Sequence, residues 1–95
     1  MQSKLINRLQ DDLPMLKWQK DFIGIKNNVG VCYLEMEAHG VIEFNIVVQT
    51  ADKKVAKFCI ERLPVIFKEF GAVHYSGLRG LEGGEYTGQV QFKAG

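Results

Sequence analysis

The sequence predicts a single α+β domain that spans residues 1–95 and has the element order α-β-β-β-α-β-β. Two segments repeat apolar residues at helical spacing, whereas the segments between and after them alternate apolar and polar residues. Turn residues separate the alternating segments, which indicates hairpins. We therefore expect an antiparallel sheet with two helices packed on one face and a long C-terminal hairpin.

The first helix is expected near the N-terminus, in SKLINRLQDDL. Apolar side chains recur there at helical spacing, and Ser3 is placed to cap the helix. Pro14 is expected to stop or kink it, because proline removes a hydrogen-bond donor and clashes with the preceding turn. Residues 15–21 are compatible with another turn. Residues 21–26 and 29–37 then flank Asn27-Asn28, a pair that tolerates the positive φ of a hairpin turn.

The next hairpin joins residues 29–37 to residues 41–49, and the apolar pattern indicates its register. A two-residue turn would mix apolar and polar side chains on both faces, whereas a three-residue turn, Ala38-His39-Gly40, separates them. Gly40 then lies where such a turn needs positive φ. The predicted apolar face consists of the cross-strand pairs Met36–Ile42, Leu34–Phe44 and Cys32–Ile46.

The second helix is expected in TADKKVAKFCIERLPVIFKEFG. Thr50 can cap it, Asp52 suits its first turn, and Gly71 suits its end. Pro64 lies inside the helix and is expected to kink it. The predicted buried stripe consists of Val55, Phe58, Cys59, Leu63, Ile66, Phe67 and Phe70.

The stretch GLRGLEGGEYTG, residues 77–88, is interpreted as the tip of the last hairpin. It lacks the GxxxxGK[ST] and GxGxxG patterns of phosphate-binding loops and opens no helix. A two-residue turn at Gly83-Gly84 places apolar residues on one face. The pairs predicted by this register are Leu81–Tyr86, Gly77–Val90 and Tyr75–Phe92. Such a hairpin offers an edge for pairing with a second subunit, so we expect a homodimer.

Composition and charge argue against several classes of function. The formal net charge is +1, so no whole-molecule field attracts nucleic acid or anionic lipid. No apolar run approaches the length of a membrane span, about 18 residues, and MQSKLINRLQDDLP lacks the apolar block of a signal peptide. Cys32 and Cys59 match no metal-binding spacing and are interpreted as reduced core thiols. We expect a cytoplasmic protein without cofactor, metal or membrane contact.

Acidic residues mark the outer face of the predicted sheet. The hairpin register places Glu35 opposite Glu43, with Glu37 and Tyr33 on the same face. Like charges directly opposed are unfavourable. Three interpretations stay open: a solvated strand face, a surface that receives a basic partner, and a carboxylate pair with one raised pKa for acid–base chemistry.

A basic helix face and a lone arginine are candidate anion-binding features. Arg79 is expected either to pair with Glu82 or Glu85 or to hold an anion together with the amides of Gly80 and its neighbours. The second helix carries outward lysines, which are Lys53, Lys54, Lys57 and Lys68. ADKKVAKF resembles the KKxAK opening of the last helix in double-stranded RNA-binding domains, and EAHGVIEF is similar to their histidine-bearing loop. The resemblance spans about twenty residues, ends before two further strands, and implies duplex nucleic-acid binding.

The aromatic residues allow one further interpretation, a small-ligand pocket between the helices and the last hairpin. Its lining would consist of Trp18, Tyr75, Tyr86 and Phe92, and the same residues can instead complete the core. No cofactor fingerprint, metal spacing or catalytic triad is found. We therefore expect a small non-enzymatic binding or accessory protein that acts on a protein partner, of a kind often carried on mobile genetic elements. Nucleic-acid binding and small-ligand binding are the two alternatives.

Overall fold

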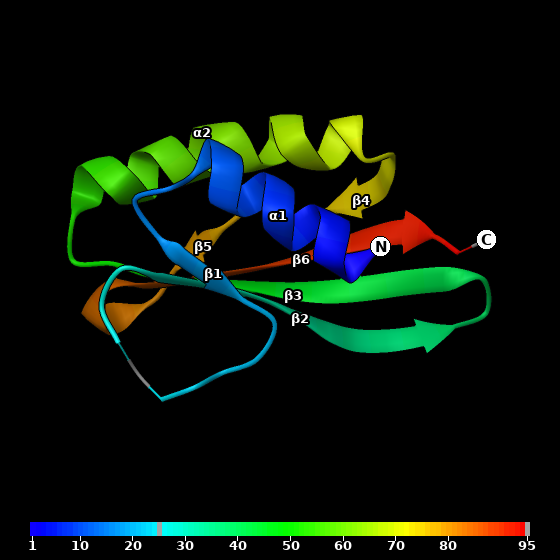
Figure 1. Cartoon of the computed structure of the whole chain (residues 1–95), viewed down its shortest axis with the longest axis horizontal. Coiled ribbons are helices and arrows are strands. Elements are labelled where there is room, and N and C mark those ends of the chain that lie inside the picture. The colour runs from blue at the N-terminus through cyan, green and yellow to red at the C-terminus, as the bar shows by residue number, and fades with distance from the viewer. Residues whose placement is uncertain (25, 95) are drawn as a thin grey trace.

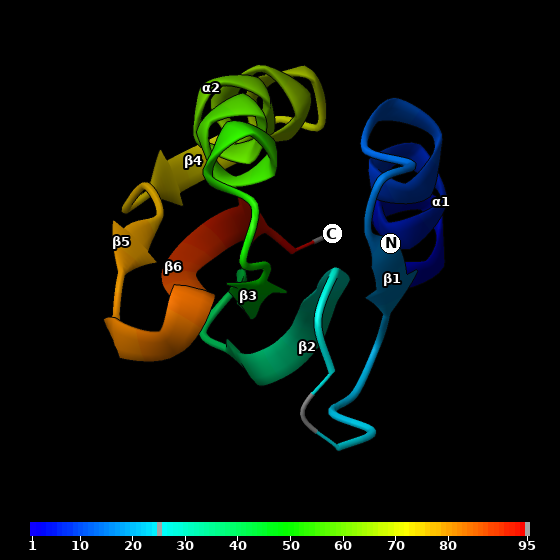
Figure 2. The ribbon, with the colours of Figure 1, turned by 90° about the vertical axis from the view of Figure 1, so that its left-hand side faces the viewer.

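The computed structural model describes residues 1–24 and 26–94 of the chain. Within them, two helices cover one face of a six-stranded, mostly antiparallel sheet, which confirms the predicted α+β fold (Figures 1 and 2). The sheet order is β1-β2-β3-β6-β4, and β5 extends the β4 edge by pairing with β6. The elements are α1 (Gln2–Asp12), β1 (Lys17–Gln19), β2 (Val29–Ala38), β3 (Val41–Gln49), α2 (Lys53–Glu69), β4 (Ala72–Tyr75), β5 (Arg79–Gly80), a 3₁₀ helix (Glu82–Gly84) and β6 (Glu85–Lys93).

Helix α1 ends before Pro14, as predicted, but it begins at Gln2, two residues earlier than an N-cap at Ser3 would require. Ser3 lies inside the helix, and its hydroxyl accepts a hydrogen bond from Lys20 Nζ at 2.8 Å. The prediction of an N-cap at this serine was therefore wrong. Leu5 and Leu9 are fully buried and direct the apolar stripe of the helix into the core.

The segment after Pro14 forms a strand, not another helical turn. β1 pairs in parallel with β2, and Trp18 lies opposite Gly30. The indole lies so close to the glycine backbone that a Cβ on Gly30 would be 2.5 Å from the ring. Trp18 Nε1 donates to the Leu13 carbonyl at 3.2 Å, which fixes the other side of the ring. The packing of one large ring on one glycine therefore holds β1 against the sheet.

The predicted hairpin across Asn27-Asn28 was wrong. Residues 20–24 and 26–28 form a connecting loop, and Ile25, which the predicted strand included, lies outside the described residues. Asn28 does adopt a positive φ, of 60°. Its side-chain oxygen accepts a hydrogen bond from the Thr50 hydroxyl at 2.9 Å, so the asparagine ties this loop to the start of α2.

The β2–β3 hairpin keeps most of the predicted register but closes with a shorter turn. Its predicted pairs Leu34–Phe44 and Cys32–Ile46 are present. The turn contains two residues, His39 and Gly40, both with positive φ. A β-bulge between Leu34 and Met36 absorbs the extra residue, so that Met36 faces Glu43 and Glu37 faces Ile42. The predicted pair Met36–Ile42 is therefore not formed.

Helix α2 begins at Lys53 with Asp52 as its N-cap, in place of the predicted Thr50. The Asp52 carboxylate accepts hydrogen bonds from two backbone amides of the first turn. Thr50 is 1% exposed and bonds to the loop instead. The helix continues through Pro64 and is followed by Gly71 with a φ of 82°. Its buried residues are Ala56, Cys59, Leu63, Ile66 and Phe67, whereas Phe58, predicted to be buried, is 39% exposed.

The two helices are joined by ion pairs at their polar edges. Asp12 of α1 accepts hydrogen bonds from Arg62 at 2.9 Å and from Arg8 at 3.0 Å, and Arg8 also pairs with Glu69. The hydrogen bonds from Arg62 and Arg8 hold the pKa of the Asp12 carboxyl below its ordinary value. This network connects α1 to α2 above the apolar core.

The C-terminal hairpin differs from the predicted register. Its tip is the 3₁₀ helix, and the observed pairs include Gly80–Tyr86 and Tyr75–Val90 in place of Leu81–Tyr86 and Tyr75–Phe92. β6 also pairs with β3 along its whole length, so it lies inside the sheet. On this side of the sheet, the exposed edge therefore belongs to β4 and β5. No helix within the described residues is long and apolar enough to cross a membrane.

Candidate functional site

The sheet is covered by helices on one face only, and we call the opposite side the outer face (Figure 2). Strand alternation directs every second side chain to this face. The outer-face residues of the three central strands form cross-strand rows. These rows consist of Val31–Val47–Thr87, Tyr33–Asn45–Gln89 and Glu43–Gln91. The outer face is therefore apolar toward one end and polar in its centre.

Hydrogen bonds order the polar part of the outer face. Asn45 Nδ2 donates to the Tyr33 hydroxyl at 2.9 Å and to Glu35 Oε2 at 2.6 Å. In the next row, Gln91 Nε2 donates to Glu43 Oε1 at 2.8 Å. Desolvation, and then the charge of Glu35, raise the pKa of Tyr33 above its ordinary value. The phenol therefore stays neutral and presents a fixed hydrogen-bonding group to the solvent side of the sheet.

The predicted acidic face is only partly assembled. Glu35 and Glu43 share the outer face, but the bulge places Met36 opposite Glu43, so the two carboxylates are not a directly opposed pair. Glu37 pairs with Ile42, whose side chain packs against the core, and it therefore lies on the helix side. Tyr33 lies beside Asn45 as predicted. The carboxylates of Glu35 and Glu43 each accept a hydrogen bond from a neutral side-chain amide, and neither faces another carboxylate.

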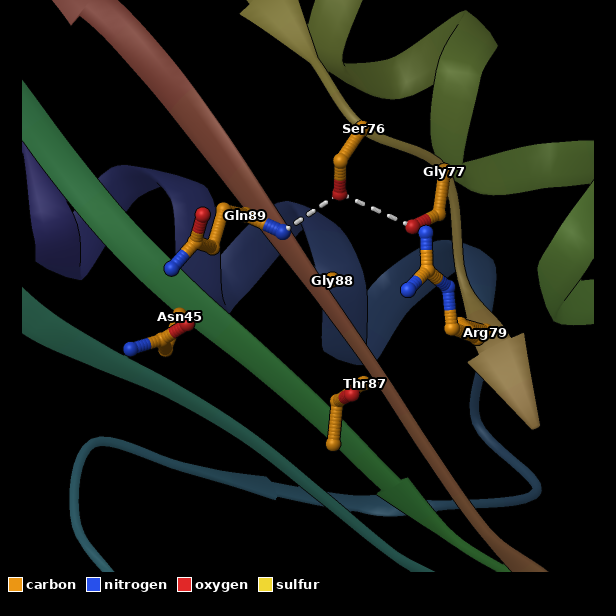
Figure 3. A pocket seen from close by; sticks show the side chains of 7 residues that line it. All are labelled: Asn45, Ser76, Gly77, Arg79, Thr87, Gly88 and Gln89. Carbon is orange, nitrogen blue, oxygen red and sulfur yellow. Dashed lines mark hydrogen bonds between the residues drawn. The ribbon is translucent and has the colours of Figure 1, made fainter. Parts of the chain in front are cut away.

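A polar groove of about 240 Å³ opens where the edge strand is interrupted between β4 and β5 (Figure 3). We call it the Arg79 groove. Its lining residues are Asn45, Ser76, Gly77, Arg79, Thr87, Gly88 and Gln89. Arg79 is the only charged residue among them and forms no ion pair within residues 1–24 and 26–94. The groove thus combines one guanidinium with hydroxyl and amide groups.

Two glycines and a serine produce the interruption. Gly77 has a φ of 79°, which turns the chain out of the strand conformation. Ser76 Oγ accepts a hydrogen bond from the backbone N–H of Gln89 at 2.9 Å and donates to the Gly77 carbonyl oxygen at 3.0 Å (Figure 3). Gly88 lies directly under this carbonyl, and a Cβ there would be 2.6 Å from the Gly77 oxygen. Both glycines are therefore required by the backbone path that forms the groove.

Such a lining suits an anionic or hydrogen-bonding group. A guanidinium with adjacent hydroxyl and amide groups can hold a carboxylate or a phosphate oxygen. Of the two residues predicted to hold an anion, Arg79 lines the groove, whereas Gly80 lies outside the lining and next to the Tyr86 ring. Arg79 could be identified from the sequence as a candidate, whereas Asn45, Thr87 and Gln89 could not. The available signal was the polar alternation of β6, at Glu85, Thr87, Gln89 and Gln91.

An apolar patch adjoins the polar rows. Val29, Val31 and Val47 are less than a tenth exposed and form a small cluster with Tyr33 on the outer face. Phe22 of the connecting loop lies against Tyr33, with ring centroids 5.1 Å apart, yet remains 56% exposed. An exposed aromatic side chain beside ordered polar groups is a common composition for a protein-binding surface.

The predicted basic residues all lie exposed on α2, at a distance from the outer face. Lys53, Lys54 and Lys57 gather at the first turns of the helix. Lys68 follows Lys57 by eleven positions, a separation of about 16 Å along a helix axis. These lysines form no ion pair within the described residues. The structure therefore brings three of the four together at one end of α2.

The predicted aromatic pocket residues lie in the core or against it. Trp18 on β1 and Tyr75 on β4 belong to opposite edges of the sheet. Phe92 is 1% exposed, and Tyr86 packs partly buried against the same core. The Tyr75 hydroxyl is buried without a hydrogen-bond partner among the described residues. The structure does not bring these four residues together around one pocket.

Other reactive side chains are dispersed. Both cysteines are free and buried, and desolvation raises the pKa of Cys32 to about 12 and that of Cys59 to about 11. His39 lies in the β2–β3 turn and His74 on β4. No group of three or more His, Cys, Asp or Glu side chains in residues 1–24 and 26–94 could hold a metal ion. No known protein family, curated protein or solved structure matches this chain.

Proposed function

We propose that this protein is a small non-enzymatic binding protein that contacts a protein partner through the outer face of its sheet. One observation carries the proposal: the uncovered face presents an ordered polar row, Tyr33–Asn45–Gln89, beside the exposed ring of Phe22. Aromatic anchors surrounded by fixed polar groups are the side chains that contribute most to protein interfaces. The protonated, buried cysteines do not supply a nucleophile, which supports a role in binding.

Capture of partners from the native cell tests this proposal. Tagged wild-type protein is compared with Gln89→Arg, which adds bulk and charge to the outer face at an exposed position. The matched control is Lys53→Glu, an exposed charge change on α2. We expect quantitative mass spectrometry to find proteins that bind wild type and the Lys53 variant but not the Gln89 variant. The same proteins bound equally by all three would contradict the proposal.

The same comparison tests binding through the basic end of α2. The lysines there are exposed and without ion pairs in the described residues, which is the observation that favours nucleic acid. If nucleic acid is the ligand, capture is lost in Lys53→Glu and after nuclease treatment, and binding weakens steeply with salt. If the outer face is the binding surface, neither nuclease nor the lysine change reduces capture.

We also propose that the protein forms a homodimer. Apolar side chains at the far end of the β2–β3 hairpin support it, because Leu34 is 46% exposed and Met36 48% exposed. Light scattering after size-exclusion chromatography tests the proposal. We expect a mass near twice that of the 10.7 kDa chain for wild type and a lower mass for Leu34→Lys/Met36→Lys. A monomeric wild type at high concentration would overturn this proposal and leave the outer-face proposal intact.

A further inference from the structure

The β4 edge of the sheet offers strand backbone that is not paired. β4 is the last strand in the sheet order, and within residues 1–24 and 26–94 no strand pairs with its outer side. Every second residue of an edge strand directs its N–H and C=O groups away from the sheet. Proteins commonly protect such an edge with lysine or proline. The β4 sequence, AVHY, contains neither residue, and Val73 is 61% exposed.

The opposite edge, β1, is also without a strand on its outer side within the described residues, but it carries more protection. β1 contains three residues, pairs in parallel with β2, and carries the exposed Lys17. The buried Trp18 of this strand faces the core and the Gln10 side chain bonds to its backbone amide at 2.9 Å. β1 is therefore protected by its lysine and by the Gln10 contact as well as by its length, whereas β4 has only its short length and one bulge and offers backbone for strand pairing.

Hollows lie on both sides of the β4 edge. On the helix side, a cavity of about 310 Å³, which we call the α2–β4 hollow, is formed between the end of α2 and β4. Its lining residues are Pro64, Phe67, Lys68, Ala72, Val73, His74 and Tyr75. The Arg79 groove lies along the same edge, beyond the C-terminal end of β4 (Figure 3). Because side chains of a strand alternate between faces, a strand added to β4 would direct side chains toward both.

The charges around this edge are positive and unpaired. Lys68 borders the α2–β4 hollow and Arg79 lines the groove, and neither forms an ion pair within the described residues. The nearest carboxylate in the sequence to Lys68, that of Glu69, is already paired with Arg8. An acidic side chain on the added strand would complement this charge.

We propose that β4 binds an extended, acidic segment of a partner protein by strand addition. The segment pairs its backbone with β4, places a carboxylate in the Arg79 groove, and places an apolar side chain against Pro64 and Phe67. This inference rests on the proposed protein-binding function and names the part of the partner that the sheet holds. β4 contains four residues and one bulge, and the edge is interrupted before β5, which suits a short peptide better than a second sheet.

Selection from a phage-displayed library of short random peptides on the immobilised full chain tests the inference. An enriched peptide is then synthesised with a fluorophore, and its affinity is measured by anisotropy. We expect enriched peptides to share an acidic residue within an alternating apolar pattern. Binding should weaken about tenfold in Arg79→Ala and in Val73→Lys. It should be unchanged in Lys53→Ala, which alters an exposed cation at the opposite end of α2 from the α2–β4 hollow.

Backbone pairing has its own readout. Two versions of the peptide are N-methylated, one at the odd-numbered and one at the even-numbered amides. Binding should be abolished in one version and unchanged in the other, because only one set of amides faces β4. Amide hydrogen exchange of Val73 and Tyr75 should slow when the peptide binds, while that of Trp18 on the opposite edge stays the same. Peptides that bind without these effects, and protect the Tyr33–Asn45–Gln89 row instead, would overturn strand addition while the outer-face function stands.

Two other outcomes would also overturn the inference. If no peptide is enriched and the β4 amides become protected only as protein concentration rises, a second copy of the chain occupies this edge. If no peptide is enriched and the β4 amides exchange freely at every concentration, the edge has no strand partner. The proposed function fails by a different result, the equal capture of proteins by wild type and Gln89→Arg.

Discussion

Replacement of Gly88 by alanine should destabilise the protein through the backbone path of the Arg79 groove. The added Cβ would be 2.6 Å from the Gly77 carbonyl oxygen. The backbone fixes the position of both atoms, so no side-chain rotation relieves the contact. Relief requires the edge segment to move away from β6. That movement breaks the hydrogen bonds Ser76 N–H to Gln89 O, at 3.0 Å, and Gln89 N–H to Ser76 Oγ, at 2.9 Å.

The expected magnitude follows from these contacts. Two lost hydrogen bonds cost about 1–3 kcal/mol together, and overpacking of a buried site costs a similar amount. Lower chain entropy in the unfolded state offsets this by less than about 1 kcal/mol. A net loss of at least about 2 kcal/mol lowers Tm by about 8 °C or more in a domain of this size.

Thermal unfolding followed by circular dichroism measures this effect. The control is Gln89→Ala, which removes an exposed side chain without a hydrogen bond in the described residues, and which should change Tm by no more than about 4 °C. A Gly88→Ala protein with the same Tm as this control would refute the close approach of Gly77 to β6.

Three further changes have expected outcomes. Gly30→Ala should displace Trp18, the only tryptophan, from its 6% exposed position. The change should lower the free energy of unfolding by about 1–3 kcal/mol and shift the tryptophan fluorescence emission to longer wavelength. Unchanged emission would contradict the packing of the ring on the glycine. Tyr75→Phe should raise the Tm measured by calorimetry by a few degrees, because it removes a buried hydroxyl that has no hydrogen-bond partner among the described residues. A fall in Tm would show that the hydroxyl is hydrogen-bonded. Asp12→Asn should lower Tm near pH 6, and the difference from wild type should shrink as the pH is lowered. The hydrogen bonds from Arg62 and Arg8 hold the folded pKa of Asp12 below its ordinary value. The carboxylate therefore stabilises the fold above that ordinary value, and its contribution is lost as the pH falls through the folded pKa. A Tm difference between wild type and Asp12→Asn that does not change with pH would contradict this ion-pair network.

Local sequence patterns predicted the elements whose structure depends on nearby residues. The apolar stripe of α2 and the left-handed Gly71 at its end identify that helix, and Pro14 correctly marks the end of α1. Alternation in β2 and β3 gave the correct pairing of Leu34 with Phe44, because a shift by one residue would bury polar side chains. These predictions needed only spacing and turn chemistry.

The features that the sequence did not predict depend on contacts between distant segments. β1 contains three residues and has no alternation of its own, so its existence follows from the packing of Trp18 on Gly30. The bulge at Glu35 offsets a turn one residue shorter than expected, and periodicity does not distinguish these two solutions. That same bulge decides which carboxylates share the outer face.

The candidate site shows the same limit. Arg79 could be identified as a lone cation, but the groove also needs Asn45 from β3 and Gln89 from β6. These strands are neighbours only because β6 lies between β3 and the β4 edge, and no local pattern contains that order. The glycines in residues 77–88 were correctly interpreted as a hairpin, yet Gly77 and Gly88 also form the floor of a recess within it.

Hydrogen–deuterium exchange of the free protein and of its complex with a captured protein partner tests the central proposal most directly. If the outer face is the binding surface, exchange slows in β2, β3 and β6, where the Tyr33–Asn45–Gln89 row lies, and stays unchanged in α2. Slower exchange confined to α2, with the outer face unaffected, would contradict this proposal.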